Sequence, residues 1–208
     1  MVTLDGPAAS GKSSVARRVA EELRIPFVSS GLLYRAATYL VRRRGIDIDD
    51  EREIAGLLER LQVELLPRLS SENRVLIEGC DVTDELHTDD VDACVSAVSR
   101  HPKVRAWVYH RLREIKRPFV IEGRDMGTAV FPDATHKFYL TAPAEVRAAR
   151  RVAERQGDLK AVTALLKLRD RLDAKQLEPA ADAVHVDTTE IGIEEVTRHV
   201  LEAVRVGA

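Results

Sequence analysis

Short apolar runs alternate with amphipathic stretches along most of the chain. Val2–Leu4 is a short apolar run, and Val15, Val19 and Leu23 recur four residues apart in the stretch that follows it. A spacing of three or four residues places side chains on one face of a helix, whereas short apolar runs bounded by turn signals are typical of buried strands. The repeated order of strand and helix therefore predicts an α/β fold with a parallel central sheet.

The same pattern sets the bounds of the expected elements. The predicted strands of the parallel sheet are residues 2–4, 27–28, 119–121, 137–140 and 183–186. The predicted helices are residues 11–23, 32–44, 91–100, 102–115, 143–155, 158–172 and 193–204. One more helix is expected to begin at a cap on Asp49 and to bury Ile54, Leu57, Leu58 and Leu61.

Three short strands follow one another without a helix between them. They are Val63–Leu66, Arg74–Glu78 and Asp81–Thr83, and turn signals join them at Ser70–Asn73 and at Glu78-Gly79. Consecutive strands joined by turns predict a small antiparallel insert. We therefore expect one domain over residues 1–208, with the insert at residues 63–90.

Composition narrows the class of protein. The chain has 208 residues with a net charge of −2, and only 4% of its residues are aromatic. This balance argues against a nucleic-acid-binding surface. No run approaches the ~18 uncharged apolar residues of a membrane-spanning helix, and no signal peptide is visible at the N-terminus. The two cysteines, Cys80 and Cys94, are expected to be free thiols in the cytoplasm.

The segment after the first predicted strand carries the strongest chemical signal. Residues Gly6–Ser13 match the pattern GxxxxGK[ST] at every fixed position, between a strand and a helix. Glycines let the backbone wrap a phosphate, so that its N–H groups and the helix N-terminus face the anion. Lys12 would add a mobile cation, and the hydroxyl of Ser13 suits Mg²⁺, which prefers oxygen ligands.

This loop predicts an ATP-binding site. The predicted ATP-binding residues are Gly6, Pro7, Ala8, Ala9, Ser10, Gly11, Lys12, Ser13 and Ser14. The loop alone does not distinguish hydrolysis from transfer to a second substrate, or from a nucleotide-dependent switch.

Several further motifs resemble one family. Ser29–Arg35 resembles the SGxxYR segment of bacterial cytidylate kinases, and Glu122–Ala134 is close to that family's DGRDMGTVVFPDA block. Asp5-Gly6-Pro7, Ile77–Thr83 and Pro179–Ala183 are also similar to it. The resemblance spans essentially the whole chain, and the block from Glu122 is its most specific part.

The resemblance implies a three-layer P-loop kinase fold, with a parallel, five-stranded central sheet, a small antiparallel β insert on the acceptor side and a short helical lid at residues 155–178. It implies the transfer of the γ-phosphoryl group of ATP to CMP or dCMP with Mg²⁺, by a monomer in the cytoplasm. The residues expected to bind the acceptor nucleotide are Ser30, Arg35, Ser96, Arg105, Arg124, Asp125, Arg169 and Asp173. Lys12, Arg124 and Arg169 are the expected catalytic residues, and Ser13 is the expected metal ligand.

Physical chemistry supports an acceptor site for a nucleotide. Arg35 and Arg124 lie on separate elements, and two planar guanidinium groups are suited to fork onto one phosphate. By resemblance, Ser96 and Arg105 would read the cytosine ring together with Asp125.

The predicted lid departs from the family pattern. Arg169–Asp173 resembles the family's RDxxD stretch, but Gln176 stands where the family usually has a further arginine, and the segment before Pro179 is shorter. One phosphate-binding arginine is therefore missing from the sequence. Either Lys175 or Arg171 could take the place of this missing arginine.

Three other functions compete with this interpretation. A kinase for UMP, AMP or a non-nucleotide alcohol would share the loop, although the Glu122 block argues against it. A nucleotide-dependent switch is disfavoured because the chain has no guanine-selecting NKxD motif. A nucleic-acid-binding ATPase is disfavoured by the charge balance.

Overall fold

The computed structural model describes residues 1–69, 72–155 and 157–206. The predicted turn residues Ser70 and Ser71, residue 156 of the predicted lid and residues 207–208 lie outside the described residues. The chain folds as two compact units. The first unit comprises residues 1–27 and 118–208, and the second comprises residues 28–117.

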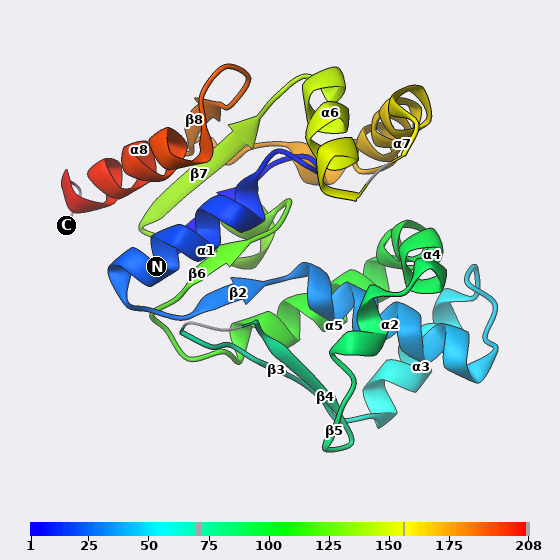
Figure 1. Ribbon diagram of the computed structural model, residues 1–208. Helices are drawn as coiled ribbons and strands as arrows, with labels where there is room; N and C mark the ends of the chain where they lie inside the picture. Colours follow the sequence, from blue (N-terminus) through cyan, green and yellow to red (C-terminus); the bar gives the residue numbers. More distant parts are fainter. Residues whose placement is uncertain (70–71, 156, 207–208) are drawn as a thin grey trace. The chain divides into compact units, whose positions relative to one another are not determined.

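Five strands form a parallel sheet in the order β2-β6-β1-β7-β8 (Figure 1). They are β1 (Val2–Asp5), β2 (Phe27–Ser29), β6 (Val120–Glu122), β7 (His136–Thr141) and β8 (Val184–Asp187). The central strand β1 pairs in parallel with β6 on one side and with β7 on the other, so that Leu4 lies beside both Glu122 and Phe138. The predicted parallel, five-stranded sheet is confirmed.

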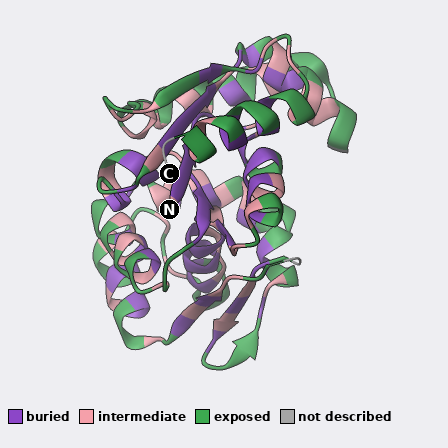
Figure 2. Cartoon of the chain, turned by 90° about the vertical axis from the view of Figure 1, so that its left-hand side faces the viewer, coloured by how far each residue is buried: buried purple, intermediate pink, exposed green. Residues whose placement is uncertain are grey.

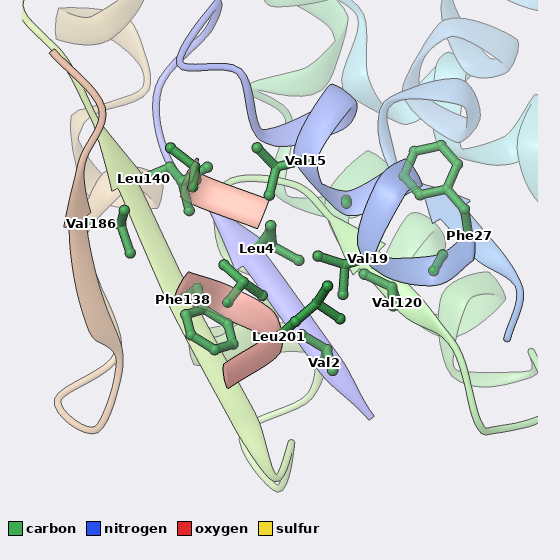
Figure 3. Packing of buried hydrophobic residues seen from close by; sticks show 14 residues of the cluster. Val2, Leu4, Val15, Val19, Phe27, Val120, Phe138, Leu140, Val186 and Leu201 are labelled. Atoms are coloured by element: carbon green, nitrogen blue, oxygen red, sulfur yellow. The ribbon is translucent and has the colours of Figure 1, made fainter. Parts of the chain in front are cut away.

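The side chains of β1 alternate between the apolar core and a polar, buried face of the sheet. Successive side chains of a strand point to opposite faces. Val2 and Leu4 pack against Val15, Val19 and other residues of α1 (Lys12–Leu23) and α8 (Ile193–Val206), as Figure 3 shows. The burial map in Figure 2 shows buried residues in the strands and on the helices, while the outer faces of the helices are exposed. The other face of β1 carries Thr3 and Asp5, which are both buried.

The phosphate loop leaves β1 at a position that only glycine tolerates. Gly6 has a φ of 144°, and a Cβ atom there would lie 2.2 Å from the backbone oxygen of Leu140 on β7. The backbone at the start of the loop therefore lies tightly against the neighbouring strand β7. This close approach fixes the loop at the carboxyl edge of the sheet.

Two helices that follow β7 lie side by side next to the loop. They are α6 (Ala144–Arg155) and α7 (Leu159–Leu172), and a short 3₁₀ turn, η3 (Ala174–Leu177), follows them (Figure 1). Ala8 of the loop packs with Ala148 of α6 and Leu166 of α7. Asp158 caps α7 by accepting a hydrogen bond from the Ala161 N–H, so this helix begins one residue later than predicted.

The second unit contains four helices among its described residues and a three-stranded antiparallel sheet. The helices are α2 (Gly31–Arg44), α3 (Glu51–Arg60), α4 (Asp89–Ser99) and α5 (Pro102–Arg113), and a 3₁₀ turn, η1 (Asp84–His87), precedes α4. The strands β3 (Val63–Leu66), β4 (Arg74–Ile77) and β5 (Cys80–Asp81) pair in that order. The predicted small antiparallel sheet is thus present, and the α/β fold class is confirmed.

Several predicted boundaries in this unit differ from the observed ones by one or two residues, and two of these errors have a clear physical cause. The cap of α3 is Asp50 instead of Asp49, because the Asp50 side chain accepts a hydrogen bond from Glu53 N–H, while Asp49 pairs with Arg100. The last strand ends at Asp81 instead of Thr83. The Asp81 carboxylate accepts hydrogen bonds from both the backbone and the hydroxyl of Thr83, which turns the chain into η1.

No helix among the described residues is long and apolar enough to cross a membrane.

Candidate active site

The predicted phosphate loop adopts a curved backbone between β1 and α1. Ala9 has a φ of 60° and Gly11, the residue before α1, has a φ of 87°. Residues in the left-handed region turn successive N–H groups toward one side, which is the geometry of an anion-binding nest. The N-terminus of α1 adds its dipole on the same side of the loop.

Lys12 lies inside this loop. Its ammonium group donates a hydrogen bond of 2.9 Å to the backbone oxygen of Pro7, and its side chain is buried. Burial lowers the pKa of Lys12 to about 8, the Glu122 carboxylate opposes the shift, and the charges of Arg124 and Arg169 add to it. Because this pKa lies close to neutral pH, the negative charge of an arriving phosphate would favour the protonated form of Lys12.

Asp5, which directly precedes the loop, faces the segment that follows β6. Its two carboxylate oxygens accept hydrogen bonds of 2.8 Å from the backbone N–H groups of Met126 and Gly127. Burial raises the pKa of Asp5 to about 7, although both hydrogen bonds oppose that shift. The end of β1 thereby holds the backbone just after Arg124 and Asp125, two of the predicted substrate-binding residues.

Arg124 and Arg169 converge on one carboxylate. Arg124 Nη2 lies 3.0 Å from Asp173 Oδ2, and Arg169 Nε lies 3.8 Å from the same oxygen. Arg169 and Asp173 lie at the end of α7, whereas Arg124 follows β6. The first unit therefore brings Lys12 together with three residues of the predicted transfer site.

Arg35 is held by the second unit. It lies in the first turns of α2, donates to the backbone oxygen of Leu86 at 2.9 Å and pairs with Asp92 Oδ1 at 2.5 Å. Ser30, the residue before α2, is buried. These contacts fix the Arg35 side chain on one side of α2.

Arg105, on α5, is placed by aromatic rings. Its guanidinium group lies 5.4 Å from the ring centroids of both Tyr34 and Tyr109, and it donates to the backbone oxygen of Ser99 at 3.2 Å. Its Nε and Nη2 also donate to the Tyr109 hydroxyl, at 3.1 Å and 3.0 Å, and these contacts together hold the planar group in one orientation. Ser96 lies on α4, one turn before Ser99.

The predicted site residues thus fall into two groups. Lys12, Arg124, Asp125, Arg169 and Asp173 belong to the first unit, and Ser30, Arg35, Ser96 and Arg105 belong to the second. A phosphate shared by Arg35 and Arg124, and a base read by Asp125 together with Ser96 and Arg105, remain predictions.

The comparisons with known proteins agree along the full chain. Residues 2–206 match the family model described as cytidylate kinase. The chain belongs to the cytidylate kinase family. It is 56% identical over 205 residues to the cytidylate kinase of Thermus thermophilus, covering 99% of this chain and 98% of that one. The cytidylate kinase of Deinococcus radiodurans is 53% identical over 201 residues, and that of Bacillus subtilis is 38% identical over 214 residues. The two alignments cover 97% and 98% of this chain, and 97% and 95% of those relatives.

Solved structures support the fold of this cytidylate kinase family member. A crystal structure of a Thermus thermophilus protein matches with a TM-score of 0.52 and 18% identity, covering 99% of this chain and 95% of the other. An uncharacterized protein from Eubacterium ventriosum matches with a TM-score of 0.55 and 13% identity, covering 98% and 97% of the two chains. At these identities the likeness concerns the fold alone.

The magnesium site predicted from the sequence would need few protein ligands. Among the described residues, no group of three or more His, Cys, Asp or Glu side chains could hold a metal ion. Mg²⁺ usually keeps several waters and binds one or two protein groups together with substrate phosphates. The exposed Ser13, in the first turn of α1, fits such a partial site.

Four residues that support this site were not singled out by the sequence. Asp5 stood in the Asp5-Gly6-Pro7 motif, and Tyr34 precedes Arg35 in its motif, so their positions gave a signal. Asp92 and Arg147 lie in charged helices and gave none, because each acquires its partners only in the folded chain. Asp92 holds Arg35, and Arg147 contacts the phosphate loop.

Proposed function

We propose that this chain transfers the γ-phosphoryl group of ATP to the 5′-phosphate of CMP or dCMP, giving ADP and CDP or dCDP. Membership of the cytidylate kinase family over residues 2–206 carries this proposal. The loop geometry around Lys12 supports it, because a left-handed nest at a helix N-terminus suits the phosphates of ATP.

The proposed reaction is a direct, in-line displacement. An acceptor phosphate oxygen is already nucleophilic at neutral pH, so no covalent enzyme intermediate is needed, and catalysis consists of positioning and charge neutralisation. Lys12 would neutralise charge on the transferring group. Arg124 and Arg169, now turned toward Asp173, would exchange that carboxylate for phosphate oxygens.

Ser13 is the residue proposed to hold Mg²⁺ at the loop. When bound, the ion would neutralise charge on the β- and γ-phosphate oxygens. The remaining ligands would come from the nucleotide and from water.

The acceptor nucleotide is proposed to bind through Ser30, Arg35, Ser96 and Arg105 of the second unit, together with Arg124, Asp125, Arg169 and Asp173 of the first. The ion pair of Arg35 with Asp92 and the stacking of Arg105 on Tyr34 support these roles, because each cation is held in a defined direction. Asp125 is suited to accept a hydrogen bond from the N4 amino group of cytosine.

Residues 155–178 are proposed as a lid that excludes water during transfer, and residues 63–90 as the acceptor-side insert. Exclusion of water matters because an open site would hydrolyse ATP. We also propose that the protein acts as a monomer in the cytoplasm, where ATP and CMP are available; light scattering tests the monomer.

A coupled assay with ATP, Mg²⁺ and each nucleoside monophosphate tests the proposal. CMP and dCMP should be phosphorylated with a kcat/KM at least about 100-fold above that for AMP, since a site that hydrogen-bonds its base rejects analogues strongly. Phosphorylation of AMP or UMP in preference to CMP would favour another acceptor. ATP hydrolysis unaffected by any acceptor would contradict a kinase.

A further inference from the structure

Arg147 is a buried arginine whose hydrogen bonds reach three separate segments. It lies on α6 with 4% of its surface exposed. Its Nε donates to the backbone oxygen of Ala142 at 2.8 Å, and its Nη1 donates to the backbone oxygen of Ala8 at 3.0 Å. The guanidinium group also forks onto Asp170 of α7, at 2.5 Å and 3.3 Å. A buried cation with this many directed bonds fixes the relative positions of its partners.

The bond to Ala8 acts on the phosphate loop from outside. A peptide unit is planar and trans, so its carbonyl oxygen and the N–H of the next residue point in opposite directions. By holding the Ala8 oxygen, Arg147 directs the Ala9 N–H to the opposite side of that peptide. Ala9 has a φ of 60°, a conformation that costs a non-glycine residue about 1 kcal/mol or more and needs support from its surroundings.

The bond to Asp170 acts on the helix that carries a predicted catalytic residue. Asp170 follows Arg169 directly, so the fork between Arg147 and Asp170 sets the rotation of the last turn of α7. Leu166 of α7 packs against Ala8 and Ala148 on the same side, which adds an apolar contact to the ionic one. The loop and α7 are therefore joined by hydrogen bonds through Arg147 and by the apolar contact of Leu166 with Ala8.

We propose that Arg147 is a positioning residue, which orients the Ala8–Ala9 peptide for phosphate binding and ties the loop to the helix that presents Arg169. This inference rests on the proposed function, because it assigns Arg147 to the ATP loop of that kinase. In this role Arg147 acts through its protein partners and not through a reacting atom. It acts through Ala8 on ATP affinity and through Asp170 on the transfer rate.

Three measurements separate positioning from simple structural support. The dissociation constant of a non-hydrolysable ATP analogue, measured without acceptor, reports the loop. The midpoint of thermal unfolding reports the fold, and kcat with CMP reports Arg169.

Arg147→Met should weaken the binding of the analogue by about ten-fold to a hundred-fold and lower the unfolding midpoint, because Asp170 is left without its cation. The double variant Arg147→Met/Asp170→Leu removes both charges. Its unfolding midpoint should return toward that of the parent, while its affinity for the analogue should stay at least about ten-fold weaker, because Ala8 still lacks its donor. Double-variant affinity within about two-fold of the parent would overturn the proposal.

Asp170→Asn tests the second arm. The bond from Arg147 to Ala8 remains, so affinity for the analogue should change by less than about three-fold while kcat falls by about ten-fold or more. An unchanged kcat would overturn the tie to Arg169. If Arg147→Met does not fold, Arg147→Lys keeps the buried cation, and its weaker analogue binding would support the same conclusion, whereas parent-like affinity would contradict it.

Arg198→Met is the matched control. Arg198 lies on α8, is more than half exposed and forms ion pairs with Glu195 and Glu202, so its loss should leave all three measurements unchanged. The two proposals fail separately. A parent that binds the analogue but does not phosphorylate CMP contradicts the proposed function alone, and normal analogue binding by the double variant contradicts only the role of Arg147.

Discussion

Asp5 and Gly127 are 122 positions apart in the sequence, and a hydrogen bond of 2.8 Å joins the Asp5 carboxylate to the Gly127 backbone N–H. The other Asp5 oxygen accepts from Met126. The residue that leads into the phosphate loop therefore also fixes the segment that carries Arg124 and Asp125. Gly127 has no room for a side chain here, since a Cβ atom would lie 2.9 Å from Thr3 Oγ1.

The raised pKa of Asp5 predicts a pH dependence of stability. Burial raises it from 3.8 to about 7, so the folded protein holds a proton that the unfolded chain releases at lower pH. The stabilising contribution of Asp5 is complete below pH 3.8 and is lost as the pH rises through about 7. Urea unfolding measures this effect in the parent and in Asp5→Asn. As the pH rises over this range, the unfolding free energy of the parent should fall relative to that of Asp5→Asn.

Asp158→Asn is a suitable control for Asp5→Asn, because Asp158 is an exposed helix cap and asparagine caps about as well as aspartate. Its stability difference from the parent should not follow the pH trend seen for Asp5→Asn. A pH-independent difference between the parent and Asp5→Asn would show that Asp5 does not titrate in this range.

The lowered pKa of Lys12 predicts a pH dependence of activity. Burial lowers it to about 8, and a neutral amine cannot offset phosphate charge. The kcat/KM for ATP, which reports the free enzyme, should therefore fall as the pH rises through about 8. In Lys12→Arg, whatever its activity, this alkaline decline should disappear because guanidinium stays charged. A parent profile that stays level well above this pH would contradict the assignment.

Removal of Lys12 should nearly abolish transfer. Lys12→Ala takes away the cation nearest the proposed phosphate site, and kcat should fall by at least about 100-fold. The unfolding free energy should change much less than the activation free energy, because the substitution also removes the cost of burying a desolvated ammonium group. Lys103→Ala, at an exposed position on α5, provides the comparison and should retain parental kcat. Near-parental turnover of Lys12→Ala would argue against a phosphate-binding role.

Arg35 should affect the acceptor and not the donor. Arg35→Ala removes a guanidinium group held by Asp92, and the KM for CMP should rise by about ten-fold or more while the affinity for ATP stays within about two-fold. Arg42→Ala is closely matched, since Arg42 lies on the same helix and faces Asp90 of α4, but Arg42 is about half exposed. Equal loss of CMP and ATP binding in Arg35→Ala would contradict the assigned role.

Two glycine substitutions should change stability in opposite directions. Gly6→Ala places a Cβ atom 2.2 Å from the Leu140 oxygen at a φ of 144°, so the unfolding free energy should fall by about 2 kcal/mol or more. Gly56 lies within α3, and nothing lies within 4 Å of a Cβ atom there. Gly56→Ala should raise the unfolding free energy by about 0.5–1 kcal/mol. Chemical denaturation measures both, and a Gly6→Ala variant as stable as the parent would contradict the close approach.

The elements were predictable where local pattern and tertiary packing agree. Val2–Leu4 and the stripe of Val15 and Val19 follow periods of two and about 3.6 residues because the same core receives both. The error at Asp49 arose because two adjacent aspartates have the same capping chemistry. In the folded chain Asp49 pairs with Arg100, and Asp50 caps the helix. Local sequence cannot decide between such equals.

The site was predictable only where a motif carries its own geometry. The loop around Lys12 depends on glycines and a lysine at fixed spacing, so the sequence states it directly. Arg147 and Asp92 have roles that depend on partners more than 50 positions away. Arg147 bonds to Ala8, and Asp92 accepts from Arg35. The π-type turn η2 (Met126–Val130) was likewise not expected, since its direction depends on hydrogen bonds to Asp5.

The position of β1 has a consequence for how the chain folds as it is made. Its partners β6 and β7 begin at residues 120 and 136, so β1 cannot pair with either of them until more than 110 further residues have been synthesised. Residues 28–117 form a continuous unit and can complete their own contacts in the meantime, since domains generally fold as they emerge from the ribosome. The phosphate loop, which directly follows β1, therefore takes its final shape only after residues 28–117 have been synthesised.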